Sequence, residues 1–493
     1  MTTLKPRLLK GFRDSLPAIA AARQQLIDSV RKVYERYGFL PLETPALEYV
    51  DVLGKYLPES DTPDGGIFAL RDADGEWVAL RYDLTAPLSR VAAAYPDLPI
   101  PFRRYQIAPV WRKEKPGPGR FCEFYQMDFD TVGVPGVIAD AEACCLISDA
   151  LEELGIGKGD YLVRVSSRKI LGGILEATGV SYAEPGAELS PQALTALRAI
   201  DKLDRIGRDG VLALLGKGRM DESGDFTAGA ELEPSQIETV DRYLQLPRSS
   251  RTEFCDRLDA LVGGSELGQA GVQELREIDA FLSAAGYGED RVAFDSTIVR
   301  GLGYYTGPVY EATLTFEIRD EKGEPKQFGS VFGGGRYDNL VQRFTGKELP
   351  ATGASIGVDR LLDALRVLGK LPERVATAPV LVTVMDRDQL ADYQAVAVEL
   401  RQAGINAELY IGQGRFGRQL KYGDQTGKTV AVIIGGDERD RGEVALKDLR
   451  QGREVSQEIE DRKEWLAKQP AQITVPRTEL VQKIREILGR YGD

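Results

Sequence analysis

Two strand-like patterns joined by a basic loop constrain the fold of this chain more than any other feature. Within residues 102–134, RYQIAPVWRKE and FCEFYQMDFDTVG have the pattern of strands, and KPGPGR lies between them. Glycine and proline interrupt regular structure, so these pieces predict an antiparallel hairpin with a long, basic tip. A sheet that contains antiparallel pairs is therefore expected in this part of the chain.

Helices and further strands are expected on both sides of this hairpin. Ile19, Leu26 and Val30 recur at near-helical spacing and predict an amphipathic helix over residues 17–37. The next piece, FLPLETPALE, contains two prolines and is typical of an edge strand, because proline cannot donate to a sheet ladder. Strand patterns return in VAFDSTIVRGLGYYTGPVYEATLTFEI, and ATGASIGVDRLLDALRVL predicts a strand that leads into a helix.

The length of 493 residues suggests roughly three domains, and the composition indicates where they lie. A stretch rich in Leu, Ala and charged residues predicts a helical insertion, with helices at 191–205, 234–246 and 272–286. After the linker-like KLPERVATAP, a βαβαβ alternation predicts a small α/β domain with a largely parallel sheet. The expected division is an α+β domain in two parts (1–184 and 291–372), the insertion (185–290) and the α/β domain (377–493).

The chain contains no histidine, and this excludes many kinds of active site. Ser-His-Asp and Cys-His nucleophile systems and HExxH zinc sites all require this residue. General acid–base chemistry would have to use Asp, Glu, Lys, Tyr or Cys, unless the reaction needs none.

The remaining composition points to a protein of a reducing compartment. The four cysteines form no CxxC pair, so free thiols are expected rather than disulfides or a zinc site. MTTLKPRLLKGFRDSLP lacks the apolar core of a secretory signal, and no stretch approaches the ~18 apolar residues of a membrane span. We expect a cytoplasmic protein without a membrane partner. The net charge, 63 − 76 = −13, still allows local basic patches that could bind nucleic acid.

The hairpin carries the first candidate site. Arg112 and Arg120 flank its loop, and Phe124 follows on the second strand. Guanidinium groups bind phosphate oxygens in a bidentate manner, and an aromatic ring could stack on a base. The alternative is a charged, solvated hairpin with Phe124 in the core.

Three glycine-rich pieces follow further along the chain. GGGRYD at 333–338 would let the backbone approach a ligand closely, or would form a tight turn. In GASIGVDR, Arg360 opens a helix near glycines and could meet an anion, or could form a surface ion pair. In RGLGYYTG, Arg300, Tyr304 and Tyr305 suit a polar pocket, or the tyrosines belong to a core.

A fourth piece, GQGRFG at 412–417, matches the GxGxxG pattern of dinucleotide-binding folds. It lies in the second βα turn of its domain rather than the first, and the helix after it is short and polar. An ordinary turn is the alternative, and dinucleotide binding would explain only the last quarter of the chain.

The order of these pieces resembles the three signatures of class II aminoacyl-tRNA synthetases. They are FLPLETP, the VWRKE…GRFCEFYQ hairpin and GASIGVDR. RYDLTAP, FYQMDFD, VRGLGYYTG and GGGRYDNL are more specific, and together they resemble the histidyl-tRNA synthetase family. The resemblance extends over nearly the whole chain, and the last domain is similar to that family's anticodon-binding domain. It implies a mixed, mainly antiparallel sheet with flanking helices, a helical insertion and an α/β anticodon-binding domain.

The resemblance also implies a reaction and the residues that perform it. The family activates L-histidine with ATP and Mg²⁺ through a histidyl-adenylate and then charges tRNA(His). By match, Arg112 and Arg300 are the catalytic arginines at the α-phosphate, and Arg112 also holds the histidine carboxylate. Glu114 and Phe124 would bind adenine, and Arg120 and Arg360 the γ-phosphate. Asp83, Thr85 and Gln126 would hold the α-amino and carboxylate groups of histidine, and Asp130 and Tyr305, with Tyr304 nearby, the imidazole. No protein ligand for a metal is predicted.

This chemistry is compatible with a chain that lacks histidine. A carboxylate already ionised at neutral pH attacks the α-phosphorus, so the step needs charge neutralisation rather than a general base. One departure concerns the pocket: the family usually has GLDYYTG, whereas residue 303 is glycine here. Arg300 and both tyrosines remain, so we do not interpret Gly303 as a sign of inactivity.

Other interpretations of the resemblance remain open. A regulatory subunit of ATP phosphoribosyltransferase shares this catalytic fold, but it typically lacks the C-terminal domain and key arginines. Class II synthetases for proline or threonine are disfavoured by RGLGYYTG and GGGRYD. The resemblance further implies a homodimer with FLPLETP at its interface. Candidate tRNA-binding patches are Arg415, Arg418 and Lys421, or Arg205, Arg208, Lys217 and Arg219 in the insertion.

Overall fold

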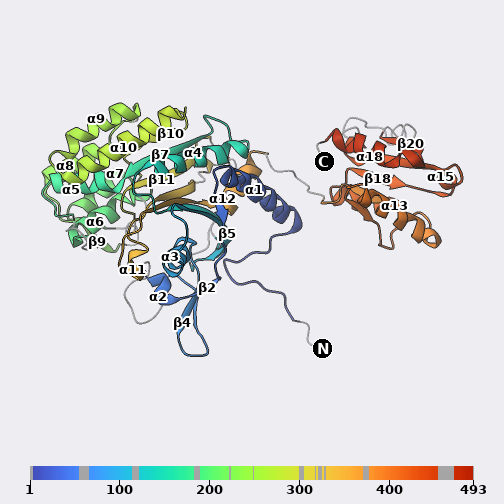
Figure 1. Ribbon diagram of the computed structural model, residues 1–493, viewed down its shortest axis with the longest axis horizontal. Helices are drawn as coiled ribbons and strands as arrows, with labels where there is room; N and C mark the ends of the chain where they lie inside the picture. The colour runs from blue at the N-terminus through green and yellow to red at the C-terminus, as the bar shows by residue number, and fades with distance from the viewer. Residues whose placement is uncertain are drawn as a thin grey trace. The chain divides into compact units, whose positions relative to one another are not determined.

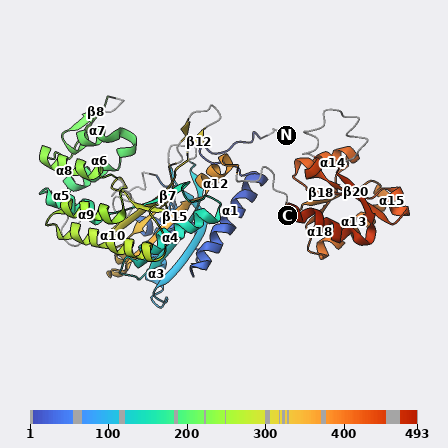
Figure 2. The ribbon, with the colours of Figure 1, turned by 90° about the horizontal axis from the view of Figure 1, so that it is seen from above.

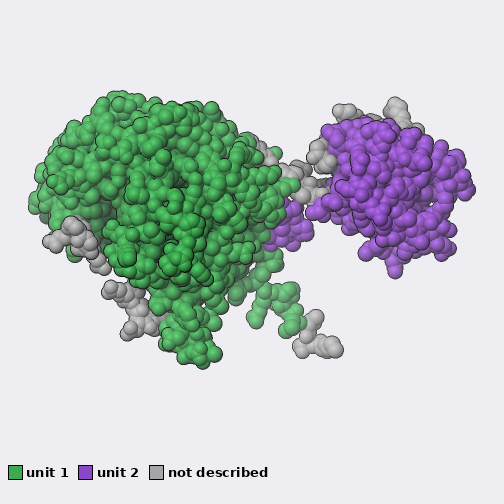
Figure 3. Space-filling model, viewed as in Figure 1, with its two compact units in different colours: residues 1–14, 23–371 green, residues 15–22, 372–493 purple. Residues whose placement is uncertain are grey.

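The computed structural model forms two compact units, residues 1–14 with 23–371 and residues 15–22 with 372–493 (Figure 3). The residues that it describes are 4–54, 66–113, 121–182, 189–220, 224–247, 249–298, 305–316, 318–319, 325–326, 329–369, 377–452 and 471–491.

An eight-stranded sheet forms the centre of the first unit (Figure 1). The pairs between the inner strands are antiparallel, whereas the edge strands β1 and β10 run parallel to their neighbours. This confirms the mixed, mainly antiparallel sheet. Its order is β1 (Leu40–Pro41), β5 (Phe102–Trp111), β6 (Glu123–Val132), β15 (Ala351–Gly357), β14 (Ser330–Arg336), β11 (Pro308–Leu314), β7 (Tyr161–Ser167), β10 (Val292–Phe294).

The predicted hairpin is formed by β5 and β6, and its register sets up the polar face of the sheet. Arg104 lies opposite Asp130, and Gln106 lies opposite Asp128. Side chains alternate along a strand, so Gln126, Asp128 and Asp130 share one face of β6. The loop residues 114–120 lie outside the described residues.

Helices cover the opposite, apolar face of this sheet. The predicted N-terminal helix is α1 (Pro17–Arg36), and its buried Tyr34 ring packs 5.3 Å from Phe129 of β6, centroid to centroid. Helix α4 (Ile138–Glu153) contacts β7, β11, β14 and β15, and Figure 2 shows it lying along the sheet. Burial of apolar side chains on this face leaves the polar side chains of β6 for the other one.

Short elements complete the rim of the sheet. They are the small sheet β2 (Leu47–Tyr49), β4 (Trp77–Leu80), β3 (Ala69–Arg71), helices α2 (Val50–Leu53), α3 (Thr85–Ala94), α11 (Gln342–Thr345) and α12 (Val358–Val367), and the pair β12 (Ile318–Arg319) and β13 (Pro325–Lys326). Helix α12 follows β15 directly, as the strand-to-helix pattern predicted.

The expected insertion is mainly helical but is not all helix. The helix expected at 191–205 is two helices separated at residues 201–202, and a hairpin that composition did not predict follows them. A Cβ on Gly173 would lie 2.2 Å from the Cα of Gly268, so these glycines allow α5 and α10 to pack closely. Helix α5 (Arg168–Ala177) precedes the expected insertion, whose elements are α6 (Pro191–Ile200), α7 (Leu203–Leu215), β8 (Gly218–Met220), β9 (Phe226–Ala228), α8 (Pro234–Leu244), α9 (Arg251–Val262), α10 (Glu266–Ala284).

The second unit contains the predicted βαβαβ pattern, but its sheet is mixed rather than largely parallel. β17, β16 and β18 are parallel, whereas β19 and β20 are antiparallel. The chain between β18 and β19 holds only the five-residue α15, which is too short for a crossover. The elements are β16 (Val380–Val382), α13 (Leu390–Gln402), β17 (Ala407–Leu409), α14 (Phe416–Gln425), β18 (Val430–Ile433), α15 (Gly436–Asp440), β19 (Glu443–Asp448), β20 (Gln472–Pro476), α18 (Leu480–Gly489).

Within the described ranges, no helix combines the length and the apolar character needed to cross a membrane. The four cysteines are buried and free, as expected from their spacing.

Candidate active site

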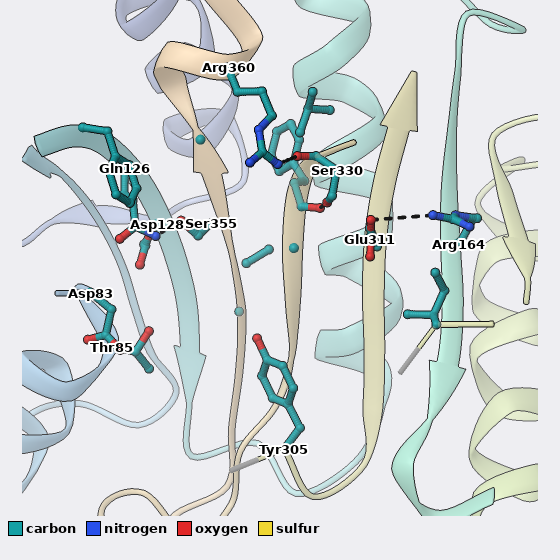
Figure 4. A pocket seen from close by; sticks show the side chains of 18 of the residues that line it. Asp83, Thr85, Gln126, Asp128, Arg164, Tyr305, Glu311, Ser330, Ser355 and Arg360 are labelled. Carbon is teal, nitrogen blue, oxygen red and sulfur yellow. Dashed lines mark hydrogen bonds and ion pairs between the residues drawn. The ribbon is translucent and has the colours of Figure 1, made fainter. Parts of the chain in front are cut away.

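A cavity of about 840 Å³ opens on the polar face of the central sheet (Figure 4). Its wall comes from the start of α3, from β6, β15, β14 and β11, and from the junction of α6 and α7. The structure brings together in this wall every predicted site residue that it describes: Asp83, Thr85, Arg112, Phe124, Gln126, Asp130, Tyr305 and Arg360.

The other predicted site residues lie outside the described residues. They are Glu114, Arg120, Arg300 and Tyr304, and Gly303 lies outside as well.

One end of the cavity contains a buried carboxylate, that of Asp130. Its Oδ2 lies 2.6 Å from the guanidinium of Arg104, which is fully buried, and its Oδ1 accepts a hydrogen bond from the Tyr337 hydroxyl. Burial raises the pKa of Asp130, and the positive charge of Arg104 opposes that shift. The carboxylate is therefore held in one orientation by two partners from other strands or loops.

Gly353 makes the room for this carboxylate. Gly353 lies opposite Asp130 in the ladder between β15 and β6. A Cβ on Gly353 would lie 2.3 Å from Asp130 Oδ1, closer than any real contact. The first glycine of GASIGVDR therefore leaves space for a side chain of the neighbouring strand and does not form a turn.

A second carboxylate, Asp83, caps helix α3. Its Oδ1 accepts a hydrogen bond from the backbone N–H of Ala86 at 3.0 Å, which fixes the side chain beside Thr85. Burial raises the pKa of Asp83, while its backbone hydrogen bonds and the charge of Arg112 oppose the shift. Figure 4 shows Asp83 and Thr85 together at one side of the cavity.

A third carboxylate, Asp128, lies close enough to both for their charges to act on it, and it was not predicted as a site residue. The Gln126 amide donates to the Ser355 hydroxyl at 2.5 Å, and that hydroxyl in turn hydrogen-bonds the Asp128 carboxyl. Burial raises the pKa of Asp128 to about 7, and the nearby carboxylates of Asp130 and Asp83 add to the shift. This end of the cavity therefore concentrates negative charge.

The other end carries arginines, of which Arg112 is close enough to the carboxylate end for its charge to act on Asp83. The Arg112 Nε donates to the Tyr82 carbonyl at 3.0 Å, and its guanidinium carbon lies 5.2 Å from the centre of the Phe124 ring. Arg360, at the start of α12, donates to the Ser330 carbonyl at 2.6 Å. Guanidinium groups beside an aromatic ring suit a ligand that joins phosphates to a flat base.

Arg13, from the N-terminal segment, stabilises the arginine end of the cavity. Arg13 forms an ion pair with Asp359, the residue before Arg360, and lies 3.9 Å over the Phe121 ring. The other Asp359 oxygen accepts from the backbone N–H of Tyr125 at 3.0 Å. The carboxylate of Asp359 thus joins the N-terminal segment, strand β6 and helix α12.

Glycines also explain the position of Tyr305. A Cβ on Gly335 would lie 3.0 Å from the Tyr305 ring, so the bare strand lets the ring lie against it. GGGRYD is therefore part of strand β14 rather than a turn, and its arginine does not face the cavity. Arg336 is buried and forms an ion pair with Asp140 of α4.

Sequence reasoning missed several residues of the wall. Asp128 had a signal, because Gln126, Asp128 and Asp130 alternate along one strand and must share a face. Arg104 lies opposite Asp130 in the predicted hairpin, but the sequence did not define the register of that hairpin, and Tyr337 reaches Asp130 from a distant segment. Glu311, its partner Arg164 at 3.6 Å, and Asp201 and Arg205 from the insertion also line the cavity.

The GxGxxG piece does not have the geometry of a dinucleotide site. It joins β17 to the ten-residue α14. Cβ atoms on Gly412 and Gly414 would lie 2.7 and 2.6 Å from the Tyr410 hydroxyl. The tyrosine occupies the space through which a pyrophosphate would have to approach these glycines, so the structure favours an ordinary turn.

Known proteins resemble the chain over almost its whole length. Residues 11–361 match the family model described as histidyl-tRNA synthetase, and residues 379–487 match the model of an anticodon binding domain. Histidine–tRNA ligase of Cereibacter sphaeroides is 55% identical over 97% of both chains, and that of Dinoroseobacter shibae is 54% identical over 99% of this chain and 98% of its own.

A solved structure supports the same assignment. The histidyl-tRNA synthetase of Nostoc sp. PCC 7120 superimposes with a TM-score of 0.77 at 30% identity, over 99% of this chain and 100% of its own. The fold, the lining of the cavity and these matches agree, and the chain belongs to the histidyl-tRNA synthetase family.

Proposed function

We propose that this chain ligates L-histidine to the 3′ end of tRNA(His) through a histidyl-adenylate, with release of pyrophosphate and then AMP. One observation carries the proposal: a single cavity has buried carboxylates at one end and arginines beside an aromatic ring at the other. A zwitterionic amino acid would lie at the carboxylate end and a nucleoside triphosphate at the arginine end, with their reacting groups in line.

In the first step a histidine carboxylate oxygen attacks the α-phosphorus of ATP. A new P–O bond forms as the bond to the β-phosphate oxygen breaks, and pyrophosphate leaves. The nucleophile is already ionised, so the step needs no proton acceptor, in keeping with a chain that has no histidine. Arg112 stabilises the charge that builds up on the α-phosphate, with Arg300 as the second arginine of this step.

The other assignments follow the family motifs. Phe124 stacks on adenine, Glu114 contacts its edge, and Arg120 and Arg360 bind the γ-phosphate. The ammonium and carboxylate of histidine meet Asp83, Thr85 and Gln126. The imidazole meets Asp130, Tyr305 and Tyr304. A buried acceptor such as Asp130 selects imidazole, because a side chain without a ring N–H would leave that acceptor unpaired.

Mg²⁺ fits this cavity as a companion of ATP. Within the described ranges, no cluster of three or more acidic or cysteine side chains could hold a metal ion. Mg²⁺ usually binds through substrate phosphates with only one or two carboxylates, and Glu311 is a carboxylate of the wall. The ion supplies further neutralisation of phosphate charge, while the protein's arginines bind and orient the triphosphate.

In the second step a hydroxyl of the terminal tRNA ribose attacks the carbonyl of the adenylate, and AMP leaves. Arg205 of the insertion, exposed in the cavity wall, is suited to the approaching phosphodiester backbone. Arg208 is less suited, because two of its three guanidinium nitrogens donate to Asp241 at 2.6 Å. In this scheme residues 1–184 and 291–372 form the catalytic domain, 185–290 the insertion and 377–493 the anticodon-binding domain.

Exposed basic residues on α14 and the turn before it are the candidates for anticodon contact. Arg415, Arg418 and Lys421 are all exposed. Replacing Arg415 and Arg418 together by Glu should lower kcat/KM for aminoacylation about tenfold or more, and should leave pyrophosphate exchange without tRNA unchanged. Equal losses in both assays would contradict this role.

The chain should act as a homodimer in the cytoplasm. β1 is an edge strand of the central sheet, and Leu40 within it is 65% exposed. Tyr95 and Ile100, which precede the neighbouring strand β5, are also exposed apolar side chains, and a second copy would cover them. Analytical ultracentrifugation should give twice the chain mass, and Leu40→Glu should shift the species toward monomer. A wild-type protein that stays monomeric at micromolar concentration would exclude the dimer.

ATP–pyrophosphate exchange with each of the twenty amino acids, without tRNA, tests the activity. Exchange with histidine alone supports the proposal. Absence of exchange from folded protein would favour the alternative, a regulatory relative of ATP phosphoribosyltransferase. The alternative has less support, because the chain retains Arg112 and Arg360 in the cavity and carries an anticodon-binding domain.

A further inference from the structure

The carboxylate end of the cavity contains two buried acceptor oxygens without a donor. Among the described residues, neither Gln126 Oε1 nor Asp128 Oδ1 has a hydrogen-bond partner. Both residues belong to β6, are buried and line the cavity. An unpaired buried acceptor costs free energy, so such pairs are expected where a ligand supplies the missing donors.

The charges around these oxygens call for a cation. The carboxylates of Asp83, Asp128 and Asp130 lie near one another, the charge of the buried Arg104 acts on all three, and that of Arg112 acts on Asp83. Arg104 pairs with Asp130 and its charge also acts on Asp128, whose hydrogen-bond partner Ser355 is neutral. Burial raises the pKa of Asp128, the charge of Arg104 opposes this shift, and the carboxylates of Asp130 and Asp83 add to it. Three carboxylates thus share the charge of two guanidinium groups, so a further cation would be stabilised here.

We propose that Asp128 binds the α-ammonium group of the substrate amino acid, as the third acceptor beside Asp83 and Gln126. This inference rests on the proposed function and adds a residue to it. An ammonium group has three N–H donors, and the Asp83 carboxylate, Gln126 Oε1 and Asp128 Oδ1 provide three acceptors.

The imidazole is a poorer occupant of this position. A neutral imidazole has one donor, and Asp130, which Tyr337 and Arg104 hold in place through its two oxygens, is the acceptor assigned to it. Figure 4 places Asp128 with Gln126 and Ser355, above Asp83 and Thr85, and Tyr305 lies apart from this group. The cluster thus binds the α-ammonium group, which every amino acid carries, and its negative charge favours amines over uncharged analogues.

Two histidine analogues, one with the ammonium group and one without it, test which part of the substrate Asp128 binds. Histidinol keeps the ammonium and the imidazole, whereas 3-(imidazol-4-yl)propionate lacks the ammonium. Both would be measured as competitive inhibitors of histidine-dependent pyrophosphate exchange by the full-length protein and by Asp128→Asn. Asparagine keeps the shape of the side chain but removes its charge.

The expected result is a selective loss. Asp128→Asn should weaken histidinol about tenfold or more, because a charge-assisted hydrogen bond is lost, and should leave binding of the propionate unchanged. Equal weakening of both analogues would overturn the inference in favour of an imidazole or structural role. Unchanged binding of both would also overturn it.

A control variant separates specific from general effects. Asp140 is a buried aspartate of the same unit that does not line the cavity, so Asp140→Asn should leave the ratio of the two inhibition constants unchanged. A changed ratio in this variant would show that the ratio reports general loosening, and the inference would fall. The proposed function is tested separately, because its failure would appear as wild-type protein without histidine-dependent exchange.

Discussion

The two ends of the cavity differ in the sign of their charge and in how that charge is held. At the carboxylate end, Asp128 and Asp130 are buried on the sheet, Asp83 is half-buried beside the start of α3, and Arg104 and Arg112 neutralise part of their charge. At the arginine end, Arg112 and Arg360 each donate to a backbone carbonyl. A buried, rigid end suits the selection of a small substrate, whereas guanidinium groups suit a phosphate group that changes charge during the reaction.

The largest effect should come from the arginine end. Arg112→Ala should lower kcat/KM for histidine-dependent pyrophosphate exchange about 10³-fold, or ~4 kcal/mol, because the α-phosphate loses a donor aimed at its developing charge. Arg71→Ala, which removes an exposed arginine that lies outside the cavity wall, should not change the rate. Comparable losses in both variants would mean that overall charge matters rather than this position.

A smaller loss, confined to one substrate, should come from Asp130→Asn. Asparagine removes the charge that pairs with Arg104 and accepts from Tyr337. We expect the KM for histidine to rise about 10²-fold with the KM for ATP unchanged, and the free energy of unfolding to fall about 3 kcal/mol, since Arg104 stays buried without its partner. Steady-state exchange and urea denaturation measure the two effects.

Tyr337→Phe provides the matched comparison for Asp130. It removes one hydrogen bond and no charge, so its effect on the KM for histidine should be about tenfold smaller. If the KM values for histidine and ATP rose together in Asp130→Asn, the two ends of the cavity would not be independent.

A pair of glycine substitutions in β15, each of which adds only one methyl group, should distinguish the two ends of the cavity. Gly353→Ala places a methyl group against the Asp130 carboxylate and should raise the KM for histidine about tenfold. A Cβ on Gly357 would lie 3.9 Å from its nearest neighbour, Arg360 Cβ, which is an ordinary contact. Gly357→Ala should therefore leave the KM for histidine unchanged, and a rise in both variants would contradict this interpretation.

The last effect falls on stability rather than on catalysis. Burial raises the pKa of Asp128 to about 7 from an ordinary 3.8, so between these values it is protonated when folded and ionised when unfolded. The folded state then binds the extra proton, and stability falls as pH rises through this window, by at most about 1.4 kcal/mol per pH unit.

Asp128→Asn should remove this part of the pH dependence. Urea denaturation at pH 5 and pH 7 in both proteins measures it, and parallel curves would show that Asp128 does not titrate in this range. The groups that face Asp128 are Asp83, Asp130, Arg104, Arg81, Tyr34 and Ser355, and they are present in both proteins. Their contributions therefore cancel in the comparison.

Local patterns were sufficient to predict much of the fold. The hairpin, the N-terminal helix and the βαβαβ segment follow from side-chain periodicity, and each is present. The antiparallel β19 and β20 were not predicted, because their pairing depends on a short connection rather than on a repeating pattern. The β8–β9 hairpin was hidden in a segment whose composition is that of helices.

The residues of the site were likewise predicted only in part from the sequence. Motif order predicted Arg112, Arg360 and several other side chains that line the cavity, because their types and spacing are typical of nucleotide binding. Asp128 was overlooked although it alternates with Gln126 and Asp130. The sequence left GGGRYD open between a tight turn and a close approach of the backbone to a ligand. The structure places its first four residues in strand β14, where the lack of a side chain on Gly335 leaves space for the Tyr305 ring.

The sequence by itself determined the element types, the order of the motifs, the absence of histidine chemistry and the family. These properties depend on residue identity and on spacing along the chain. Only the tertiary structure decided that Arg104 from β5 and Tyr337 from the loop after β14 both hold Asp130, that Gly353 leaves space for it, and that Asp128 has an acceptor without a donor. Burial and contacts between distant segments determine these properties, and burial in turn sets the charge and hydrogen-bonding demands of the site.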